Sequence, residues 1–267
     1  MPSSAAGPRT ALTLSSALLR PDWPAPPNVG AVMSQRAGGV SGGPFESLNL
    51  SLSVGDEPSA VAENRARFEA AVPARVSWPW LEHGAAVVRL GRDEPRHAAQ
   101  PADGCWTREP GVACTVTAAD CMPVLFTLCD GSAVGAAHAG WRGLALGVLE
   151  ATVDAMCAGS GNTPADVLAW LGPCIGPRQF EVGADVLAAF GQPQERPDPQ
   201  RFSARRGGDG QPRWLANLPQ LALDRLQAAG VGRVVDSALC TVENPSRFFS
   251  FRRDRITGRM AAAIWRG

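Results

Sequence analysis

The chain has 267 residues, 45% of them hydrophobic and 19% charged, and its 25 basic and 25 acidic residues give a formal net charge of zero. This length and composition are typical of a globular protein with an ample core, whereas a nucleic-acid-binding or anionic-membrane-binding protein usually shows a basic excess. The basic residues are all arginine and tyrosine is absent, so chemistry that depends on a lysine or tyrosine side chain is excluded.

The N-terminal segment, residues 1–28, is rich in proline, alanine and serine. We expect it to be a partly ordered extension before a folded domain over residues 29–267. Its apolar stretch at residues 11–19 is interrupted by Thr and Ser and lacks a cleavage site of small residues, so it does not predict a signal peptide. No apolar run approaches the roughly 20 residues of a membrane helix.

Strand-like and helix-like segments then alternate along the chain. Runs of β-branched and apolar residues predict strands at residues 31–35, 111–118, 122–129, 132–138, 167–172, 233–236 and 260–265. Helical periodicity predicts helices at residues 57–72, 141–158, 182–190 and 218–229. Glycine, proline and polar residues predict a loop at residues 38–56 and a mobile insert at residues 192–212. This interleaving predicts a single α/β or mixed α+β domain with a mixed sheet.

Cys121 lies directly after Asp120 at the break between two predicted strands, and His138 ends the next strand. If these strands form a hairpin around Asp130-Gly131, Cys121 lies nine residues before the turn and His138 seven after it. Both residues then return to the same end of the sheet. A cysteine reacts as its thiolate and needs a nearby base, cation or metal. The pattern therefore predicts a functional Cys121 within reach of His138.

The chain has seven cysteines and no CxxC pair. An odd count without paired spacing argues against a secreted disulfide framework and favours a reducing compartment, so we expect a cytoplasmic protein. Free cysteines are commonly inert core residues. A structural role is therefore the expectation for Cys105, Cys114, Cys129, Cys157 and Cys174.

His83 is followed by a glycine and then by another strand-like run. Together with Cys121 and His138 it forms a set of two imidazoles and one thiolate. Such a set suits zinc or copper with a fourth position open to water or substrate. The spacing alone is no zinc signature, so a purely structural role stays open. His97 lies in a charged stretch and is expected to be a solvated loop residue.

Two groups of arginines are candidates for binding an anion. Arg142 lies four residues after His138, where a helix is predicted to begin, and a helix N-terminus beside an arginine favours anions. The alternative is an ordinary salt bridge. A second group at residues 247–259 includes Arg252 and is interleaved with phenylalanines. It is suited to a phosphate or an aromatic base, and the alternative is an edge strand with alternating charges.

Several of these segments match, in the same order, motifs of the YfiH family, whose members are also called laccase-domain or polyphenol-oxidase-like proteins. The chain resembles this family from about residue 30 onward. At Leu81 it departs from the pattern, because family members usually have glutamine there. The matching stretches are GVSGGPFESLNLSLSVGD, ENRARF, HG at residues 83–84, ADG at residues 102–104, TAADCMPVLF, AAHAGWRG, AWLGPCIGPRQFEV and CTVENPSRFFSFRRDRITGRMAAAIW.

The resemblance implies a fold of mixed sheets flanked by helices, similar to the catalytic domain of a bacterial cysteine-dependent deamidase toxin. It implies that residues 29–267 form a catalytic domain and that a metal site falls on His83, Cys121 and His138, with zinc or copper as the ion. It also implies the activity of a purine nucleoside phosphorylase, which splits adenosine, inosine or methylthioadenosine with phosphate. Deamination of adenosine is implied for some members.

Residues around this site take their expected roles from the same resemblance. Asp120 is expected to orient or deprotonate a ligand, and Arg142 to bind the phosphate. Asn49 and Arg252, in two other matching stretches, are expected to contact the substrate. The implied partners are small molecules, with no nucleic acid and no membrane, and the protein is expected to be a monomer or a homodimer.

Three other functions stay open on the sequence. A cysteine- or metal-dependent amide hydrolase, which would edit a peptidoglycan precursor, would use Cys121 as nucleophile and His138 as base. A copper-dependent polyphenol oxidase of the multicopper type needs many histidine ligands, and the chain has 3 histidines. A non-catalytic metal-binding protein is the last alternative.

Overall fold

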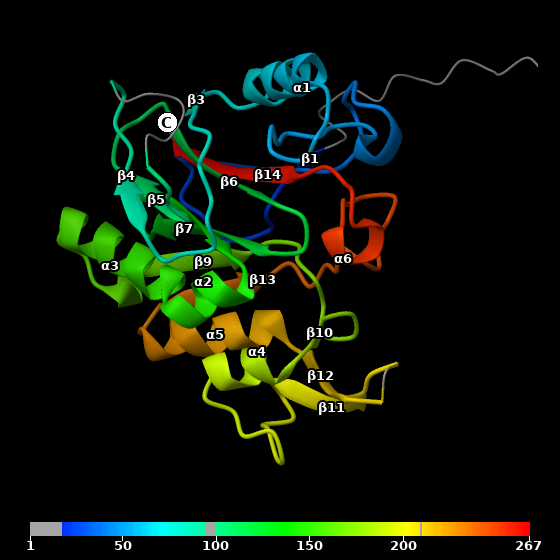
Figure 1. Cartoon of the computed structure of the whole chain (residues 1–267). Helices are drawn as coiled ribbons and strands as arrows, with labels where there is room; N and C mark the ends of the chain where they lie inside the picture. Colours follow the sequence, from blue (N-terminus) through cyan, green and yellow to red (C-terminus); the bar gives the residue numbers. More distant parts are fainter. Residues whose placement is uncertain (1–17, 94–99, 209) are drawn as a thin grey trace, which may run out of the picture.

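The computed structural model describes residues 18–93, 100–208 and 210–267, and their strands form three sheets (Figure 1). The five-stranded sheet has the spatial order β1 (Leu18–Leu19), β2 (Val29–Ser34), β14 (Met260–Arg266), β6 (Val112–Ala118) and β3 (Arg75–Val76). The six-stranded sheet has the order β13 (Arg233–Asp236), β9 (Val167–Leu171), β7 (Met122–Leu128), β8 (Val134–Ala139), β5 (Gly104–Thr107) and β4 (Val87–Arg89). The three-stranded sheet has the order β10 (Glu181–Val182), β12 (Pro212–Ala216) and β11 (Phe202–Arg206).

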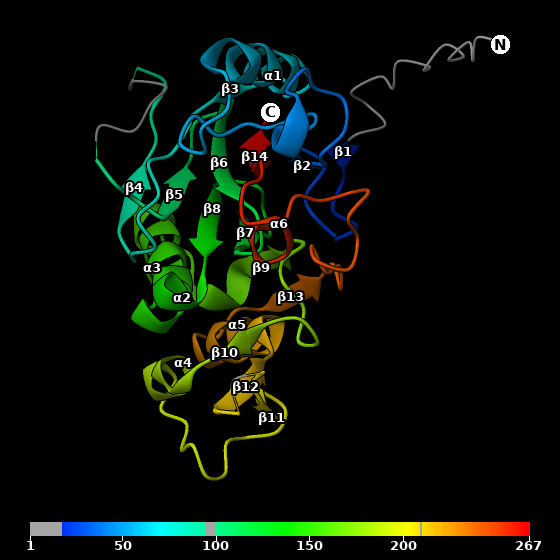
Figure 2. The same cartoon turned by 45° about the vertical axis from the view of Figure 1, so that its right-hand side comes forward.

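Helices cover the outer faces of the two larger sheets (Figure 2). Helix α1 (Pro58–Ala70) packs on the five-stranded sheet, where its Phe68 contacts the outer side of β2 and β14. The six-stranded sheet is covered by α2 (Trp141–Leu146), α3 (Val148–Ser160) and α5 (Leu218–Ala228). The other helices among the described residues are short: α4 (Ala184–Ala189), α6 (Phe251–Asp254) and two 3₁₀ turns, Gly43–Phe45 and Pro164–Asp166.

The core lies on both faces of the paired strands β7 and β8, and these two strands are buried along their full length. Val124 and Phe126 face the helices, while Leu125 and Val134 face the five-stranded sheet. Because successive side chains of a strand point to opposite faces, a strand covered on both sides must be apolar throughout. The continuous apolar sequence of β7 therefore follows from its central position.

The structure confirms the predicted mixed α/β fold and the predicted hairpin. Strands β7 and β8 pair antiparallel, with Pro123 opposite His138 and Met122 opposite Ala139. The turn between them uses Gly131 with a φ of 68°, a conformation that favours glycine. This register places Cys121, the residue before β7, next to the end of β8.

Several predicted elements are wrong in detail. The predicted helix over residues 141–158 is broken into α2 and α3 at Gly147, whose φ of 92° ends the first helix in a left-handed cap. The predicted mobile insert at residues 192–212 contains β11 and leads into β12, and the two strands pair antiparallel. The arginine-rich segment over residues 247–259 forms the short helix α6 and loops rather than an edge strand. Strand β5 was not predicted.

Two sequence expectations fall partly or wholly outside the described part of the chain. His97 and residues 1–17 of the expected N-terminal extension are not among the described residues. The described remainder of that extension contains β1, which pairs with β2. Among the described residues, no helix is long and apolar enough to span a bilayer.

Candidate active site

The hairpin brings Cys121 and His138 together, and the loop before β4 brings in His83. The Sγ atom of Cys121 lies 3.8 Å from Nε2 of His83. The rings of His83 and His138 meet edge to face with centroids 4.8 Å apart. One ligand atom from each of the three residues lies within 4.8 Å of the other two. We call these three residues the His/Cys/His centre, and the sequence predicted all of them.

Small residues after His138 let the His83 loop pack directly on the start of α2. A Cβ atom added at Gly140 would lie 2.9 Å from Cys121 Sγ and 3.0 Å from His83 Cδ2. A Cβ atom added at Gly143 would lie 2.7 Å from the carbonyl oxygen of Gly84. A Cβ atom this close to another heavy atom would clash, so only glycine permits the contact. The glycines of this segment therefore bring the third member of the centre into range.

Asp103 is hydrogen-bonded to both histidine residues of the centre. Its Oδ1 accepts a hydrogen bond from Nδ1 of His138 at 2.7 Å and one from the backbone N–H of His83 at 3.0 Å. Its Oδ2 accepts from the backbone N–H groups of Gly84 at 2.8 Å and Glu82 at 3.1 Å. Burial opposes the charge of this carboxylate, yet the hydrogen bonds from His138 and the backbone hold its pKa below the usual value.

Electrostatics favour a thiolate on Cys121. Burial alone would raise the pKa of this thiol, but the charge and hydrogen bond of His138, followed by those of His83, outweigh it and lower the pKa to about 6. Burial would likewise lower the pKa of His138, and the charge of Cys121 together with the hydrogen bond to Asp103 raises it to about 9. In the metal-free protein the two side chains therefore form a thiolate–imidazolium pair near neutral pH.

The centre fits a metal ion by its donors. Two imidazoles and one thiolate are ligands that zinc accepts, and copper also binds such sets. His138 uses Nδ1 for its bond to Asp103, which leaves Nε2 for coordination. A ligating histidine whose other nitrogen is bonded to a carboxylate is the usual arrangement around protein-bound metals. The residues present are therefore suited to hold a metal through His83, Cys121 and His138.

Asp120 is buried, and all of its carboxylate contacts are with the protein. Oδ1 accepts from the hydroxyl of Thr241 at 2.6 Å, and Oδ2 accepts from the hydroxyl of Ser250 at 3.0 Å and the backbone N–H of Arg252 at 2.6 Å. The backbone of Asp120 has a φ of 92°, which an L-residue adopts only when its surroundings hold it there. These contacts tie the turn that presents Cys121 to the C-terminal part of the chain.

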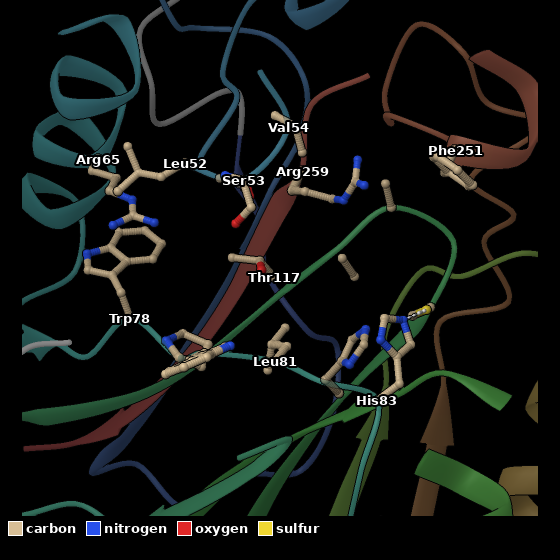
Figure 3. A pocket seen from close by; sticks show the side chains of 17 residues that line it. Leu52, Ser53, Val54, Arg65, Trp78, Leu81, His83, Thr117, Phe251 and Arg259 are labelled. Atoms are coloured by element: carbon tan, nitrogen blue, oxygen red, sulfur yellow. Dashed lines mark hydrogen bonds between the residues drawn. The ribbon is translucent and has the colours of Figure 1, made fainter. Parts of the chain in front are cut away.

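The centre lies in a pocket of about 670 Å³, a volume in the range of small-molecule sites. Figure 3 shows the stacked pair of Arg65 and Trp78 on one side, His83 on the other and Arg259 reaching in between them. The pocket also has exposed apolar lining residues, which we call the rim: Leu52, Trp80 and Phe251. The described site thus combines a thiolate and imidazoles with two arginines and several aromatic rings.

The three predicted substrate-binding residues do not line this pocket. Arg142 is exposed, and its guanidinium stacks on the ring of Trp141, with Cζ 4.5 Å from the centroid. Arg252 stacks on Phe180 and donates from Nη1 to the carbonyl oxygen of Glu181 at 2.9 Å. Neither arginine is therefore part of the pocket wall.

Asn49 supports the pocket indirectly. It is fully buried, and its Nδ2 donates to the carboxylate of Asp56 at 2.9 Å. Its Oδ1 accepts from the backbone N–H of Arg259 at 2.9 Å. Asn49 thus fixes the main chain at the arginine that does reach into the pocket.

Sequence reasoning missed two residues of this site, Asp103 and Trp80. Asp103 belongs to the Ala102–Gly104 motif, but its partners are 35 and 19–21 positions away. Arg259 belongs to the arginine group predicted at residues 247–259, but Arg252 was selected from that group because nothing in the local pattern distinguishes Arg259. Trp80 is 58% exposed, and the unusual sequence Trp-Pro-Trp at residues 78–80 is the signal that was available.

Comparison with known proteins gives close relatives over nearly the whole chain. A Pseudomonas aeruginosa protein named purine nucleoside phosphorylase is 45% identical, covering 94% of this chain and 98% of its own. The Escherichia coli purine nucleoside phosphorylase YfiH is 44% identical, covering 94% and 99%. Among solved structures, a Neisseria meningitidis protein of the DUF152 family superposes with a TM-score of 0.83 and 42% identity, covering 94% of this chain and 99% of that one.

A second solved structure and a family profile also match the chain. YlmD of Geobacillus stearothermophilus superposes with a TM-score of 0.81 at 34% identity and covers 94% of this chain and 96% of its own. The profile described as multi-copper polyphenol oxidoreductase laccase matches residues 30–267. The chain therefore belongs to this laccase-like family, the family of YfiH.

Proposed function

We propose that this protein is a purine nucleoside phosphorylase that cleaves adenosine, inosine and methylthioadenosine with phosphate. The observation that carries the proposal is a single pocket that contains the His/Cys/His centre, two arginines and several aromatic side chains. Relatives that match 94% of the chain are named purine nucleoside phosphorylases. In the reaction, a phosphate oxygen bonds to C1′ of the ribose while the C1′–N9 bond breaks. The products are ribose 1-phosphate, or 5-methylthioribose 1-phosphate from methylthioadenosine, and the purine, which takes up a proton.

Arg259 is the residue that we assign to phosphate. It lines the pocket, and its Nη1 donates to the carbonyl oxygens of Thr257 at 2.9 Å and Gly258 at 3.1 Å, which fixes the guanidinium. Burial lowers the pKa of Arg259, and the charges of Cys121 and Asp120 counter this, so the side chain stays cationic at neutral pH. A fixed guanidinium is a strong ligand for phosphate oxygens.

The aromatic residues of the pocket are assigned to the purine. Trp80 and Phe251 are 58% and 46% exposed, although large apolar side chains are normally covered. A purine that stacks on such rings buries apolar surface on both partners, and stacking does not require a particular pattern of hydrogen-bond donors. This tolerance fits a site that accepts both adenosine and inosine.

The His/Cys/His centre is assigned to the polarisation of substrate. His83, Cys121 and His138 would hold a zinc or copper ion, which would supply a Lewis acid. The same chemistry would serve the deamination of adenosine that we include as a second activity, in which water adds to the purine ring and ammonia leaves. The protein's own part is to keep the Nδ1–H of His138 hydrogen-bonded to the carboxylate of Asp103 and to keep Cys121 as a thiolate. All seven cysteines are unpaired, which supports the expectation of a reducing compartment.

The proposal is tested by the dependence of turnover on phosphate. Purified protein and a Cys121→Ala variant are incubated with adenosine or inosine, with and without phosphate, and the products are separated. We expect free base and ribose 1-phosphate only with phosphate and only from the wild type. Inosine formed from adenosine without phosphate would identify the deaminase activity alone. An absence of turnover from both nucleosides in both conditions would overturn the assignment.

A second candidate is an amide hydrolase with Cys121 as nucleophile, and one observation favours it. Cys121, His138 and Asp103 have the arrangement of a nucleophile, a base and the group that orients the base. This candidate predicts that metal-stripped protein hydrolyses amides and that alkylation of one thiol abolishes the activity. A phosphorylase that requires the metal would show neither result.

A further inference from the structure

We propose that Asp103 is a positioning residue whose single buried carboxylate sets the orientation of both histidines of the centre. The inference deepens the proposed function, because it concerns the same site, but its test uses no nucleoside. Asp103 contacts neither the pocket nor Cys121 in the described structure. It would therefore act through His83 and His138 and is no catalytic residue itself.

The carboxylate of Asp103 is fully engaged. Its side chain is 1% exposed, and its two oxygens accept four hydrogen bonds of 2.7–3.1 Å. One donor is the imidazole Nδ1 of His138, and the other three are the consecutive backbone N–H groups of residues 82–84. A carboxylate has about four acceptor sites, so this set fills it. Both histidines are thereby attached to one rigid group.

Strand pairing and backbone hydrogen bonds fix the position of Asp103. Strands β5 and β8 pair antiparallel with Gly104 opposite Ala137, and the backbone N–H of His138 donates to the carbonyl oxygen of Asp103 at 2.7 Å. The backbone N–H of Asp103 in turn donates to the carbonyl oxygen of Ala86, just before β4. Asp103 therefore lies between the strand that carries His138 and the loop that carries His83.

The backbone of His83 shows why this loop needs an anchor. His83 has a φ of 63°, in the left-handed region that a residue with a Cβ rarely adopts. Such a conformation persists when the surrounding structure over-determines it. The three backbone N–H groups that donate to Asp103 belong to His83 and to the residues on either side of it. The carboxylate thus holds the strained turn that directs the His83 ring at Cys121.

An amide at this position cannot replace the carboxylate. In Asp103→Asn one acceptor oxygen becomes an NH₂ group, which faces N–H donors and leaves two of the four bonds unmade. Either His138 loses the acceptor of its Nδ1 proton or the His83 turn loses its anchor. The variant should therefore weaken metal binding, which depends on both histidines together. The three metal-ligating side chains themselves are unchanged.

The test compares Asp103→Asn with Asp56→Asn in the full chain. Asp56 is a matched control, because its carboxylate accepts from the Ser41 hydroxyl at 2.6 Å and from Asn49 Nδ2 at 2.9 Å without contact to either histidine. The first readout is the affinity for Zn²⁺, measured by competition with a chromophoric chelator. We expect a loss of about 10- to 100-fold for Asp103→Asn and a change within about twofold for Asp56→Asn.

The second readout is the rate at which iodoacetamide alkylates Cys121 in metal-stripped protein at pH 7. We expect this rate to fall at least about fivefold in Asp103→Asn, because the histidines no longer hold the thiolate. If both the Zn²⁺ affinity and the alkylation rate stay within about twofold of the wild type, the proposal is overturned. A wild type without Zn²⁺ affinity leaves the alkylation rate to decide.

A third readout covers the case in which Asp103→Asn does not fold. Wild-type protein labelled with ¹⁵N-histidine contains 3 histidines, and we expect one slowly exchanging imidazole N–H signal, lost in His138→Gln. The Nδ1 atom carries its proton in both charge states of this histidine, so the signal does not depend on titration. Its absence in the wild type would overturn the proposal. Since none of these readouts uses a nucleoside, they fail or succeed independently of the phosphorylase assignment.

Discussion

The two parts of the pocket are built in opposite ways. At the His/Cys/His centre, His138 is 3% exposed, lies next to the last residue of a paired strand and is hydrogen-bonded to a buried carboxylate. The rim consists of loop and short-helix residues, and its Leu52 and Trp80 are 55% and 58% exposed. Positions fixed by a sheet are suited to chemistry, and exposed side chains are suited to recognition. The difference indicates that reactivity and substrate preference can be altered separately.

Removal of the thiolate should have the largest effect. We expect Cys121→Ala to lower kcat/KM for phosphorolysis at least about 1,000-fold, since it deletes a member of a group that acts as a unit. Steady-state assays with inosine and phosphate measure the loss, and circular dichroism checks the fold. Cys129→Ala is the matched control, because Cys129 is an exposed free cysteine on the same hairpin. Equal losses in both variants would contradict a special role for Cys121.

Removal of the pocket arginine should have the next largest effect. We expect Arg259→Gln to raise KM for phosphate about 100-fold, since charge-assisted hydrogen bonds contribute about 1.5–3 kcal/mol each. Arg142→Gln is the control, because its guanidinium is exposed and stacks on Trp141. The KM for phosphate of that variant should stay within about twofold of the wild type. A larger change in Arg142→Gln than in Arg259→Gln would move the phosphate site to the start of α2.

The thiolate should be visible as a pH dependence. The pKa of Cys121 is lowered to about 6, so the thiolate is present above this pH and is lost as the pH falls through it. Between pH 7 and pH 5 its fraction falls from about 90% to about 10%, and the alkylation rate of metal-stripped protein should fall about tenfold. Mass spectrometry of the Cys121 peptide over this range measures the rate. A midpoint above pH 8 would show that the histidines do not stabilise the thiolate.

The smallest effect is expected at the rim. Trp80→Ala should raise KM for inosine about fivefold and leave kcat within about twofold, because loss of one stacking surface costs about 1 kcal/mol. Ile256→Ala is the matched control, since Ile256 is 63% exposed and does not line the pocket. A fall in kcat at constant KM would show that Trp80 acts on the chemistry and not on recognition.

Local patterns predicted the part of the site that is built from neighbouring strands. The hairpin of β7 and β8 follows from two apolar runs around Asp130-Gly131, and its register brings Cys121 to His138. Arg142 shows where local reasoning stops. A helix does begin beside it, but the start of α2 packs on the His83 loop through Gly143, and Arg142 is directed to solvent. Which side of a short helix faces the site depends on tertiary packing.

The same reasoning did not find Asp103, and it did not single out Arg259 within the predicted arginine group. The function of Asp103 depends on a strand register and on the backbone of a loop 20 residues away, and neither is written in the adjacent residues. Arg253 and Arg259 lie in the same arginine-rich segment. Arg253 donates to the carbonyl oxygens of Thr241 and Phe248, whereas Arg259 lines the pocket. In a chain whose basic residues are all arginine, residue type alone does not separate a ligand from a structural support.

The anchoring of Asp120 has a consequence for biosynthesis. The three groups that donate to its carboxylate come from Thr241, Ser250 and Arg252, more than 120 positions after Asp120. The contacts that hold the turn of Cys121 therefore form only after this later segment has been synthesised. A nascent chain that stops before residue 241 lacks this support for Cys121. Synthesis of residues 241–252 is thus a late step in the maturation of the site.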